Sequence, residues 1–475
     1  MIHHISRKWI VLAIVTLVSF ITNLDATIVV IGLPLMVHDL ELTMLTGLWI
    51  ITSYIITSTI FLLPAGRWAD MIGTKRIFIF GFAIFTIATI LCGISTSGTT
   101  LIMARFLQGI GAAFSLSTAT PIIIRTFPDN QLGLAIGINS TAWVIGSIAG
   151  PVIGGALLNY FGWQSIFFVT VPFSVLGMIG GWFVLESKDV LKKAKTDWWG
   201  ILSFGAGLIT LLLALSEGPS SGWLSLFIVS LFLTTLLMWI AFIAIEMHTP
   251  SPLFKLNILT NIHYTTGLVI TVNYCIGYFA ILFLLTLYLQ GALQLTPLQS
   301  GILMIPLSAP QLIASPFGGM LADRFGPARI MLIGISFVAF GIFLLSQLGP
   351  HLSISSVVIP LLIISAAGGI AWPALAKIVF SSTPKADAGS ASGMFYTVYN
   401  IGRALSQTLA LVAMEFSVSS DVISQILQGT SIEQSQAQQN SLVYAVDSSF
   451  EFFLIFFVLA LFFTLFLIRP QNNTK

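Results

Sequence analysis

Charged side chains are what this chain most lacks: Asp, Glu, Lys and Arg make up 8% of its 475 residues, whereas hydrophobic residues make up 56%. A water-soluble domain carries about 25% charged residues, so a soluble fold of this length could not cover its surface. Basic patches interleaved with aromatic residues are also missing, and no nucleic-acid partner is expected. The composition predicts an all-α polytopic membrane protein.

Several chemical signatures are absent as well. The two cysteines, Cys92 and Cys275, both fall inside apolar stretches and do not suggest a disulfide framework. The sequence has no Walker A loop, which argues against ATP as the driving force, and no H-E-x-x-H, G-x-S-x-G or Cys/His cluster. We therefore expect no cofactor, no metal site and no enzymatic activity.

Long apolar runs dominate what is present. The first, Trp9 to Leu35, is too long for a signal-peptide core of about 7–15 residues. Windows of about 20 residues, enough to span a bilayer, recur fourteen times, near 9–35, 47–66, 77–96, 99–121, 132–156, 164–185, 199–216, 223–245, 261–290, 297–321, 329–348, 354–376, 388–412 and 449–468.

The distribution of charge predicts the topology. If the N-terminus is inside and fourteen spans follow, every Lys and Arg outside the spans falls on the cytoplasmic side. The charged residues of the external loops are then acidic: Asp39, Glu41, Glu217, Asp421, Glu433 and Asp447. By the positive-inside rule we expect a multi-pass protein of the plasma (cell inner) membrane with both termini cytoplasmic.

The chain also repeats itself. The segment from Gly66 to Ile77 matches that from Gly319 to Ile330, with Gly, Ala, Asp, Gly, Arg and Ile in common. A second match aligns Gly133, Gly137 and Gly146 with Gly389, Gly393 and Gly402. Parallel six-helix repeats are a known transporter plan. We predict six-helix bundles at 1–190 and 251–475, with two extra linker transmembrane helices at 191–250.

One acid, Asp25, lies deep inside the first span. A carboxylate inside a membrane helix costs several kcal/mol unless it is paired, hydrated or protonated. Its flanks, from Trp9 to Thr22 and from Ile28 to Met36, offer nothing that could neutralise it. The sequence therefore predicts that Asp25 exchanges a proton, although a structural acid that bonds neighbouring helices remains the alternative.

Four segments carry a resemblance to a known family: the loop Gly66 to Arg76, the helix Leu101 to Ala113, the glycine-rich run Gly146 to Gly155, and the run Leu24 to Pro34. They resemble the motifs of the major facilitator superfamily, and more narrowly those of its 14-helix drug:proton antiporters (multidrug efflux transporters). The resemblance implies the major facilitator fold, with two six-helix bundles plus two additional helices.

The resemblance also implies residue roles. Proton coupling falls to Asp25 and Arg105, and Arg105 could instead be structural. A conformational latch falls to Gly66, Asp70, Gly73, Arg76, Asp323 and Arg329, with the second copy weaker because Pro327 and Ala328 depart from the pattern. The antiporter motif falls to Gly146, Gly150, Pro151, Gly154 and Gly155, which could also serve helix packing alone.

Polar and aromatic residues within the spans are candidates for a substrate cavity, since aromatic rings can hold cations. The predicted set is Asn23, Asn139, Trp143, Tyr274, Gln311, Tyr396, Tyr399, Asn400 and Arg403. Trp and Tyr also pack helices, and Arg403 either lines the cavity or pairs with Glu415. Glu246 is expected to be a solvated helix end.

We therefore predict a secondary active transporter, a monomer in the lipid bilayer, that exports lipophilic, often cationic drugs or toxic compounds in exchange for protons by alternating access. A dedicated proton-coupled exporter of a single metabolite or antibiotic is the alternative. A membrane sensor that does not transport would tolerate decay of the latch and of the glycine motif, and both are intact.

Overall fold

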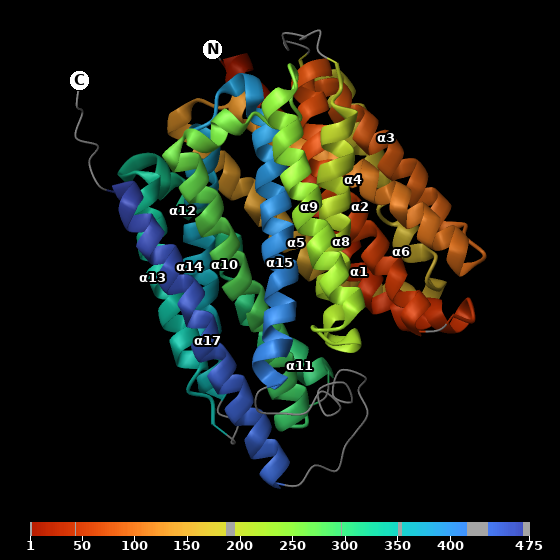
Figure 1. Cartoon of the computed structure of the whole chain (residues 1–475), viewed down its shortest axis with the longest axis vertical. Coiled ribbons are helices and arrows are strands. Elements are labelled where there is room, and N and C mark those ends of the chain that lie inside the picture. The colour runs from red at the N-terminus through yellow and green to blue at the C-terminus, as the bar shows by residue number, and fades with distance from the viewer. Residues whose placement is uncertain are drawn as a thin grey trace. The chain divides into compact units, whose positions relative to one another are not determined.

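The computed structural model describes residues 2–42, 44–186, 195–295, 297–349, 354–415 and 436–468, and these are helical with no β-strand among them (Figure 1). The chain divides into two compact units. Unit 1 comprises Met1–Leu211, Leu231–Tyr264 and Val379–Thr397, and unit 2 comprises Leu212–Ser230, Thr265–Ile378 and Val398–Lys475. Each unit is described by itself below.

The N-terminal part of unit 1 is a run of apolar helices, most of them long. They are α1 (Ile2–Asp39), α2 (Met44–Ile72), α3 (Thr74–Gly93), α4 (Gly98–Thr126), α5 (Asp129–Phe161), α6 (Ser165–Phe168) and α7 (Val171–Val184). Gly73 adopts a φ of 111°, which lets α2 turn directly into α3. Ser97 begins α4 with a capping box, in which its hydroxyl accepts from the backbone N–H of Thr100 at 3.3 Å.

Two further helices, α8 (Trp198–Ser221) and α9 (Leu226–His248), follow (Figure 1). Asp197 caps α8 by accepting a hydrogen bond of 2.8 Å from the backbone N–H of Gly200. The hydroxyls of Thr210 and Thr235 join α8 to α9 at 2.8 Å. These are the two helices that the sequence leaves unmatched between its repeats.

The remaining elements complete both units. They are η1 (Leu256–Thr260), α10 (Ile262–Thr286), the π-helical η2 (Leu287–Ala292), α11 (Pro297–Met304), η3 (Ile305–Leu307), α12 (Gln311–Phe325), α13 (Pro327–Leu345), α14 (Ile354–Ser381), η4 (Lys385–Asp387), α15 (Ala388–Glu415) and α17 (Gln436–Ile468). Pro306 and Pro310 lie between α11 and α12, where a continuous α-helix would lose backbone hydrogen bonds.

Among the described residues, thirteen helical stretches are long and apolar enough to cross a membrane. The remaining predicted window, 388–412, is also helical, as α15, but Asn400, Arg403 and Gln407 make it more polar than the others. The predicted all-α fold class is confirmed. Residues 187–194, between α7 and α8, lie outside the described residues.

Glycines allow α5 to pack closely against α1. A Cβ added at Gly146 would meet the backbone carbonyl of Phe20, and one added at Gly150 would lie 3.1 Å from the backbone nitrogen of Ile28. At Gly154 the added atom would lie 2.6 Å from the Ile28 side chain. The contact therefore runs along the turns of α1 on either side of Asp25.

A core of buried side chains supports the same region of unit 1. Ile28 and Val29 of α1 pack there with Ile50 of α2 and Ala104 of α4. Trp163 is a fully buried member of this cluster. Burial of these groups holds the backbone of α1, α2 and α4 in place around the one acid in their midst.

Two glycines of α5 provide a matched test of this packing. Gly150→Ala should destabilise the protein by about 1–3 kcal/mol, because the backbone of α1 must shift. Gly155→Ala meets nothing within 4 Å, so it should be neutral or stabilise by up to about 1 kcal/mol through helix propensity. Thermal unfolding can be followed with a thiol-reactive dye, since Cys92 and Cys275 are buried and free. Equal effects of the two substitutions would contradict this packing.

Candidate functional site

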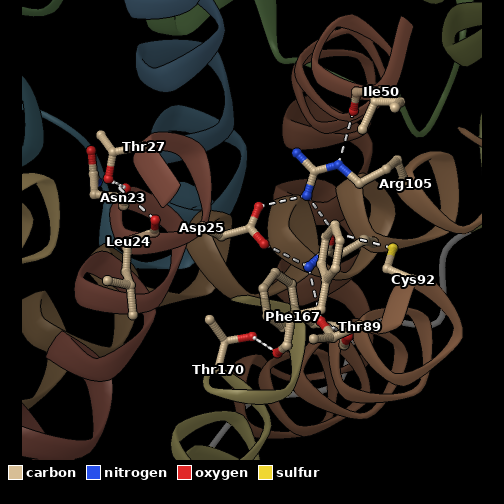
Figure 2. A network of polar contacts seen from close by, with 12 residues as sticks. Asn23, Leu24, Asp25, Thr27, Ile50, Thr89, Cys92, Arg105, Phe167 and Thr170 are labelled. Carbon is tan, nitrogen blue, oxygen red and sulfur yellow. Dashed lines mark hydrogen bonds and ion pairs between the residues drawn. The ribbon is translucent and has the colours of Figure 1, made fainter. Parts of the chain in front are cut away.

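The buried acid Asp25 meets a buried base. Asp25 on α1 is 0% exposed and Arg105 on α4 is 1% exposed. An Nη1 hydrogen of Arg105 is donated to Oδ2 of Asp25 at 2.7 Å (Figure 2). Two residues that the sequence singled out separately thus form one ion pair.

Arg105 is held from a second side by α2. Its Nε donates to the carbonyl oxygen of Ile50 at 2.9 Å (Figure 2). The Tyr54 ring lies under the guanidinium, with 4.4 Å between Cζ and the ring centroid. These contacts fix the direction of the guanidinium, which must always find acceptors because arginine keeps its proton.

Gln108 completes the site, and sequence reasoning missed its role. Its Nε2 donates to Oδ1 of Asp25 and to Oγ1 of Thr89, both at 2.9 Å, while its Oε1 accepts from Arg105 at 2.5 Å. The thiol of Cys92 lies 3.8 Å from the same Oε1. The available signal was spacing, because Gln108 comes three residues after Arg105 and shares its helix face.

Four helices therefore converge on one carboxylate. Both oxygens of Asp25 accept a hydrogen bond, and each donor is itself fixed by another helix. Adding a proton to Asp25 would remove the charge that Arg105 neutralises and would weaken the network as a whole. The arrangement can hold one negative charge, or one proton, inside the span.

Breaking the pair from one side should be costly. Arg105→Gln leaves a buried carboxylate without its counter-charge, and a loss of about 3–5 kcal/mol is expected. The double variant Asp25→Asn with Arg105→Gln leaves no unpaired charge and should be more stable than Arg105→Gln alone. Thermal unfolding of both single variants and the double variant completes the cycle. Additive losses would show that the two residues do not interact.

A second buried acid, Asp70 near the end of α2, meets the beginning of α15. Oδ1 accepts from the backbone N–H of Gly389 at 2.9 Å, and Oδ2 accepts from the N–H and hydroxyl of Ser390 at 2.8 and 2.9 Å. A carboxylate at a helix N-terminus is stabilised by the helix dipole and by the unsatisfied N–H groups there. Nη2 of Arg125 lies 3.9 Å from Oδ1.

Glycine makes this contact possible. A Cβ added at Gly66 would collide with the carbonyl of Gly389, and one added at Gly389 would lie 2.7 Å from Oδ1 of Asp70. Within unit 1, α2 and α15 therefore meet backbone to backbone. Three of the predicted latch residues, Gly66, Asp70 and Gly73, lie at this contact and at the turn that follows it.

The other predicted latch residues lie elsewhere. Asp323, the repeat counterpart of Asp70, binds Nζ of Lys377 on α14 at 2.5 Å within unit 2. Arg76 and Arg329 are exposed at the beginnings of α3 and α13. The structure gives these arginines no contact with Asp70 or Asp323, and Arg125 is the cation beside Asp70.

The contact at Asp70 should dominate the stability of the α2–α15 junction. Asp70→Ala removes three hydrogen bonds and leaves two buried N–H groups unsatisfied, so a loss of about 2–4 kcal/mol is expected. Ser390→Ala removes only the hydroxyl donor and should cost about 1 kcal/mol. The same dye-based unfolding measurement ranks the two, and a larger loss for Ser390→Ala would refute the assignment.

The predicted cavity residues of unit 1 are partly tied to the helices themselves. Nδ2 of Asn23 donates to the carbonyl of Ser19 at 3.1 Å, and the hydroxyl of Ser19 donates to Asn139 at 2.8 Å. Trp143 stacks on Tyr396 with 6.2 Å between ring centroids and an angle of 4°. Two of the predicted cavity residues of unit 1 therefore form one stacked aromatic pair.

The predicted cavity residues of unit 2 form an aromatic cluster. Tyr274 stacks on Tyr278 at 5.4 Å and lies 5.9 Å from Trp372, which in turn contacts Tyr399 at 5.5 Å. Sequence reasoning left out Tyr278, which ties the cluster to α12.

Two polar residues border this cluster. Gln311 donates to the hydroxyl of Tyr278. The guanidinium of Arg403 lies 5.3 Å from the ring centroid of Phe279. Asn400 lies on the same helix as Tyr399, α15. The side chain of Glu415, the other partner considered for Arg403, lies outside those described, as does that of Pro151.

Glu246 differs from expectation. Its residue is 5% exposed rather than solvated, because its two carboxylate oxygens accept from the backbone N–H groups of Leu253 and Phe254 at 3.1 and 3.2 Å. The acid caps the chain as it leaves α9. A turn of this kind cannot be anticipated from helical periodicity.

This arrangement of helices, with buried charges inside the spans, defines a polytopic membrane transporter. The model of the Major Facilitator Superfamily matches residues 15–407 and 267–474, and the chain belongs to this family. It is 30% identical over 401 residues to the riboflavin transporter RibZ of Clostridioides difficile, covering 84% of this chain and 86% of that protein.

Two further comparisons bear on class and fold. The chain is 29% identical over 395 residues to the multidrug transporter protein MdtP of Bacillus subtilis, covering 82% of this chain and 73% of the relative. The structure of the proton:xylose symporter XylE superposes with a TM-score of 0.67 at 13% identity, covering 98% of this chain and 96% of that one, which shows the fold alone. The chain is thus a multi-pass membrane transporter of the Major Facilitator Superfamily, and such transporters bind small molecules.

Proposed function

We propose that this transporter exports lipophilic, often cationic compounds from the cell in exchange for protons. The observation that carries the proposal is the buried ion pair between Asp25 and Arg105 inside the first and fourth spans. Intramembrane ionisable residues are costly and mark ion or substrate pathways. A buried acid that is paired with one guanidinium among the described residues is suited to taking up and releasing a proton.

Proton and substrate transport are coupled when binding of one disfavours binding of the other. Antiport requires that proton and substrate each lower the affinity for the other. A proton on Asp25 frees Arg105 from its counter-charge, and the repacking of α1 against α4 changes the surface that bound substrate. Gly146, Gly150 and Gly154 pack directly on the turns of α1 beside Asp25, so movement of α1 transmits to α5.

Asp70 supplies the second element of the cycle. Its hydrogen bonds to the beginning of α15 favour the conformation in which α2 and α15 touch. Release of this latch would accompany the opposite state of alternating access, with Asp323 and Lys377 as a weaker second copy. By the positive-inside rule, this end of the helices and both termini are cytoplasmic.

We also propose that residues 1–190 and 251–475 form the two six-helix bundles and that residues 191–250 form the two linker transmembrane helices. The two halves would rock as a monomer in the plasma (cell inner) membrane, and α8 and α9 would join them. Exposed apolar side chains along α9, among them Leu233, Leu236 and Ile240, suit a lipid-facing linker.

The aromatic clusters support a flat, lipophilic substrate. Trp143 with Tyr396 offers ring faces to a cation. In unit 2, however, Arg403 already lies over Phe279, and its positive charge disfavours a second cation there. This favours the alternative of a dedicated exporter of one metabolite, here a neutral or anionic aromatic one, and similarity to a riboflavin transporter supports an aromatic metabolite as the substrate.

Proton movement in inverted membrane vesicles tests the proposal. A pH-sensitive dye should report proton release when ethidium or a quaternary ammonium compound is added to wild type. Asp25→Asn should abolish this response, because the amide cannot carry the proton. Asp39→Asn, on the same helix but exposed at its end, serves as the control and should respond like wild type.

The results of this assay distinguish multidrug export coupled at Asp25 from the alternatives. A response that survives in Asp25→Asn would move coupling away from α1. Absence of a response to every cation, together with a response to one aromatic metabolite such as riboflavin, would replace multidrug export by the dedicated exporter. A toxicity panel in cells that express the protein then measures the breadth of substrates.

A further inference from the structure

A groove of about 610 Å³ lies on unit 1 beside the turn between α2 and α3. Its lining comes from four helices: Trp68 and Ile72 of α2, Arg76 and Phe80 of α3, Phe114 of α4, and Trp198 of α8. Apart from one guanidinium, these side chains are apolar or aromatic.

The walls of the groove are preformed. The ring of Trp68 lies 5.5 Å from that of Phe114 and 6.3 Å from that of Trp198, and Phe80 lies 5.7 Å from Phe114. Phe114 is buried at the base, whereas Phe80 and Trp198 are 54% and 62% exposed at the rim. An apolar chain can therefore enter without repacking the aromatic residues.

Arg76 places a positive charge at this groove. Its side chain is exposed and makes no hydrogen bond or ion pair with any residue in the described part of the chain. The beginning of α3 beside it carries no side-chain cap, so its N–H groups and helix dipole add to the positive potential. An apolar slot with an unpaired cation at its polar end matches an acyl chain with an anionic head group.

We propose that this groove binds an anionic phospholipid, with one acyl chain against Trp68, Phe80 and Trp198 and the phosphate at Arg76. The site depends on α8, because Trp198 forms one wall. It therefore assigns a task to the first of the two extra helices. The inference does not depend on proton exchange or on substrate, and it stands or falls separately from the proposed function.

The internal repeat supplies a matched control. Arg329 corresponds to Arg76 in the second copy and is equally exposed at the beginning of its helix, α13. Arg329 does not line this groove. Any effect of diffuse positive charge should appear in both variants, whereas an effect of the groove should appear only at Arg76.

Native mass spectrometry of the purified full-length chain in detergent tests the proposal. Phosphatidylglycerol and phosphatidylcholine with identical acyl chains are added as competing probes. Wild type should retain phosphatidylglycerol in preference, by about fivefold, the ratio expected for one arginine at an anionic lipid. Arg76→Gln should lose this preference, while Arg76→Lys and Arg329→Gln should keep it.

A further variant separates the chain from the head group. Trp198→Ala should reduce retention of both lipids, because it removes a wall but leaves the charge. Thermal unfolding verifies that each variant is folded. Equal retention of the two lipids by wild type, a preference that survives Arg76→Gln, or an equal loss in Arg329→Gln would each overturn the proposal.

Discussion

The central constraint on this molecule is the placement of one carboxylate, Asp25, in the middle of a membrane helix. Left alone, it would cost several kcal/mol. Arg105 and Gln108, both on α4, donate hydrogen bonds to this carboxylate at 2.7 and 2.9 Å. Since arginine cannot lose its proton, the pair is neutral only while Asp25 is charged, and any proton that reaches Asp25 disturbs four helices together.

Close backbone contact is the second recurring device. Gly146 and Gly150 bring α5 against α1 next to Asp25, and Gly66 with Gly389 brings α2 against α15 next to Asp70. In each case an acid lies where small residues remove the steric barrier between two helices. Small residues are the usual means by which membrane helices approach closely, and here they place the packing contacts beside the charges.

Much of the fold could be predicted, because a bilayer restricts the possible structures to apolar spans whose length can be read directly. All fourteen predicted windows lie on helical stretches of the described residues, including the more polar window 388–412, which is α15. Asp25 stood out because acids are rare in such runs, and the family resemblance assigned proton coupling to Arg105 as well.

The features that could not be predicted depend on how each helix is rotated about its own axis and on the course of the turns between helices. The roles of Gln108 and Thr89 follow from which faces of α3 and α4 meet, and polar residues of this type occur throughout spans. Glu246 was expected to be solvated, yet it caps a loop whose course no periodicity reveals. Arg76 was assigned to the latch from its motif, whereas Arg125 lies next to Asp70. Arg125 is 51 residues from Thr74 in the chain, yet its Nη1 lies 3.4 Å from the Thr74 hydroxyl.

The protonation of Asp25 can be observed directly by infrared difference spectroscopy of the reconstituted protein, with substrate added at constant pH. If substrate binding and protonation of Asp25 exclude each other, wild type should show a carboxyl band that changes when substrate binds. Asp25→Asn should lack that band. An unchanged spectrum in wild type, or a band that persists in Asp25→Asn, would contradict the claim that this buried pair couples protons to transport.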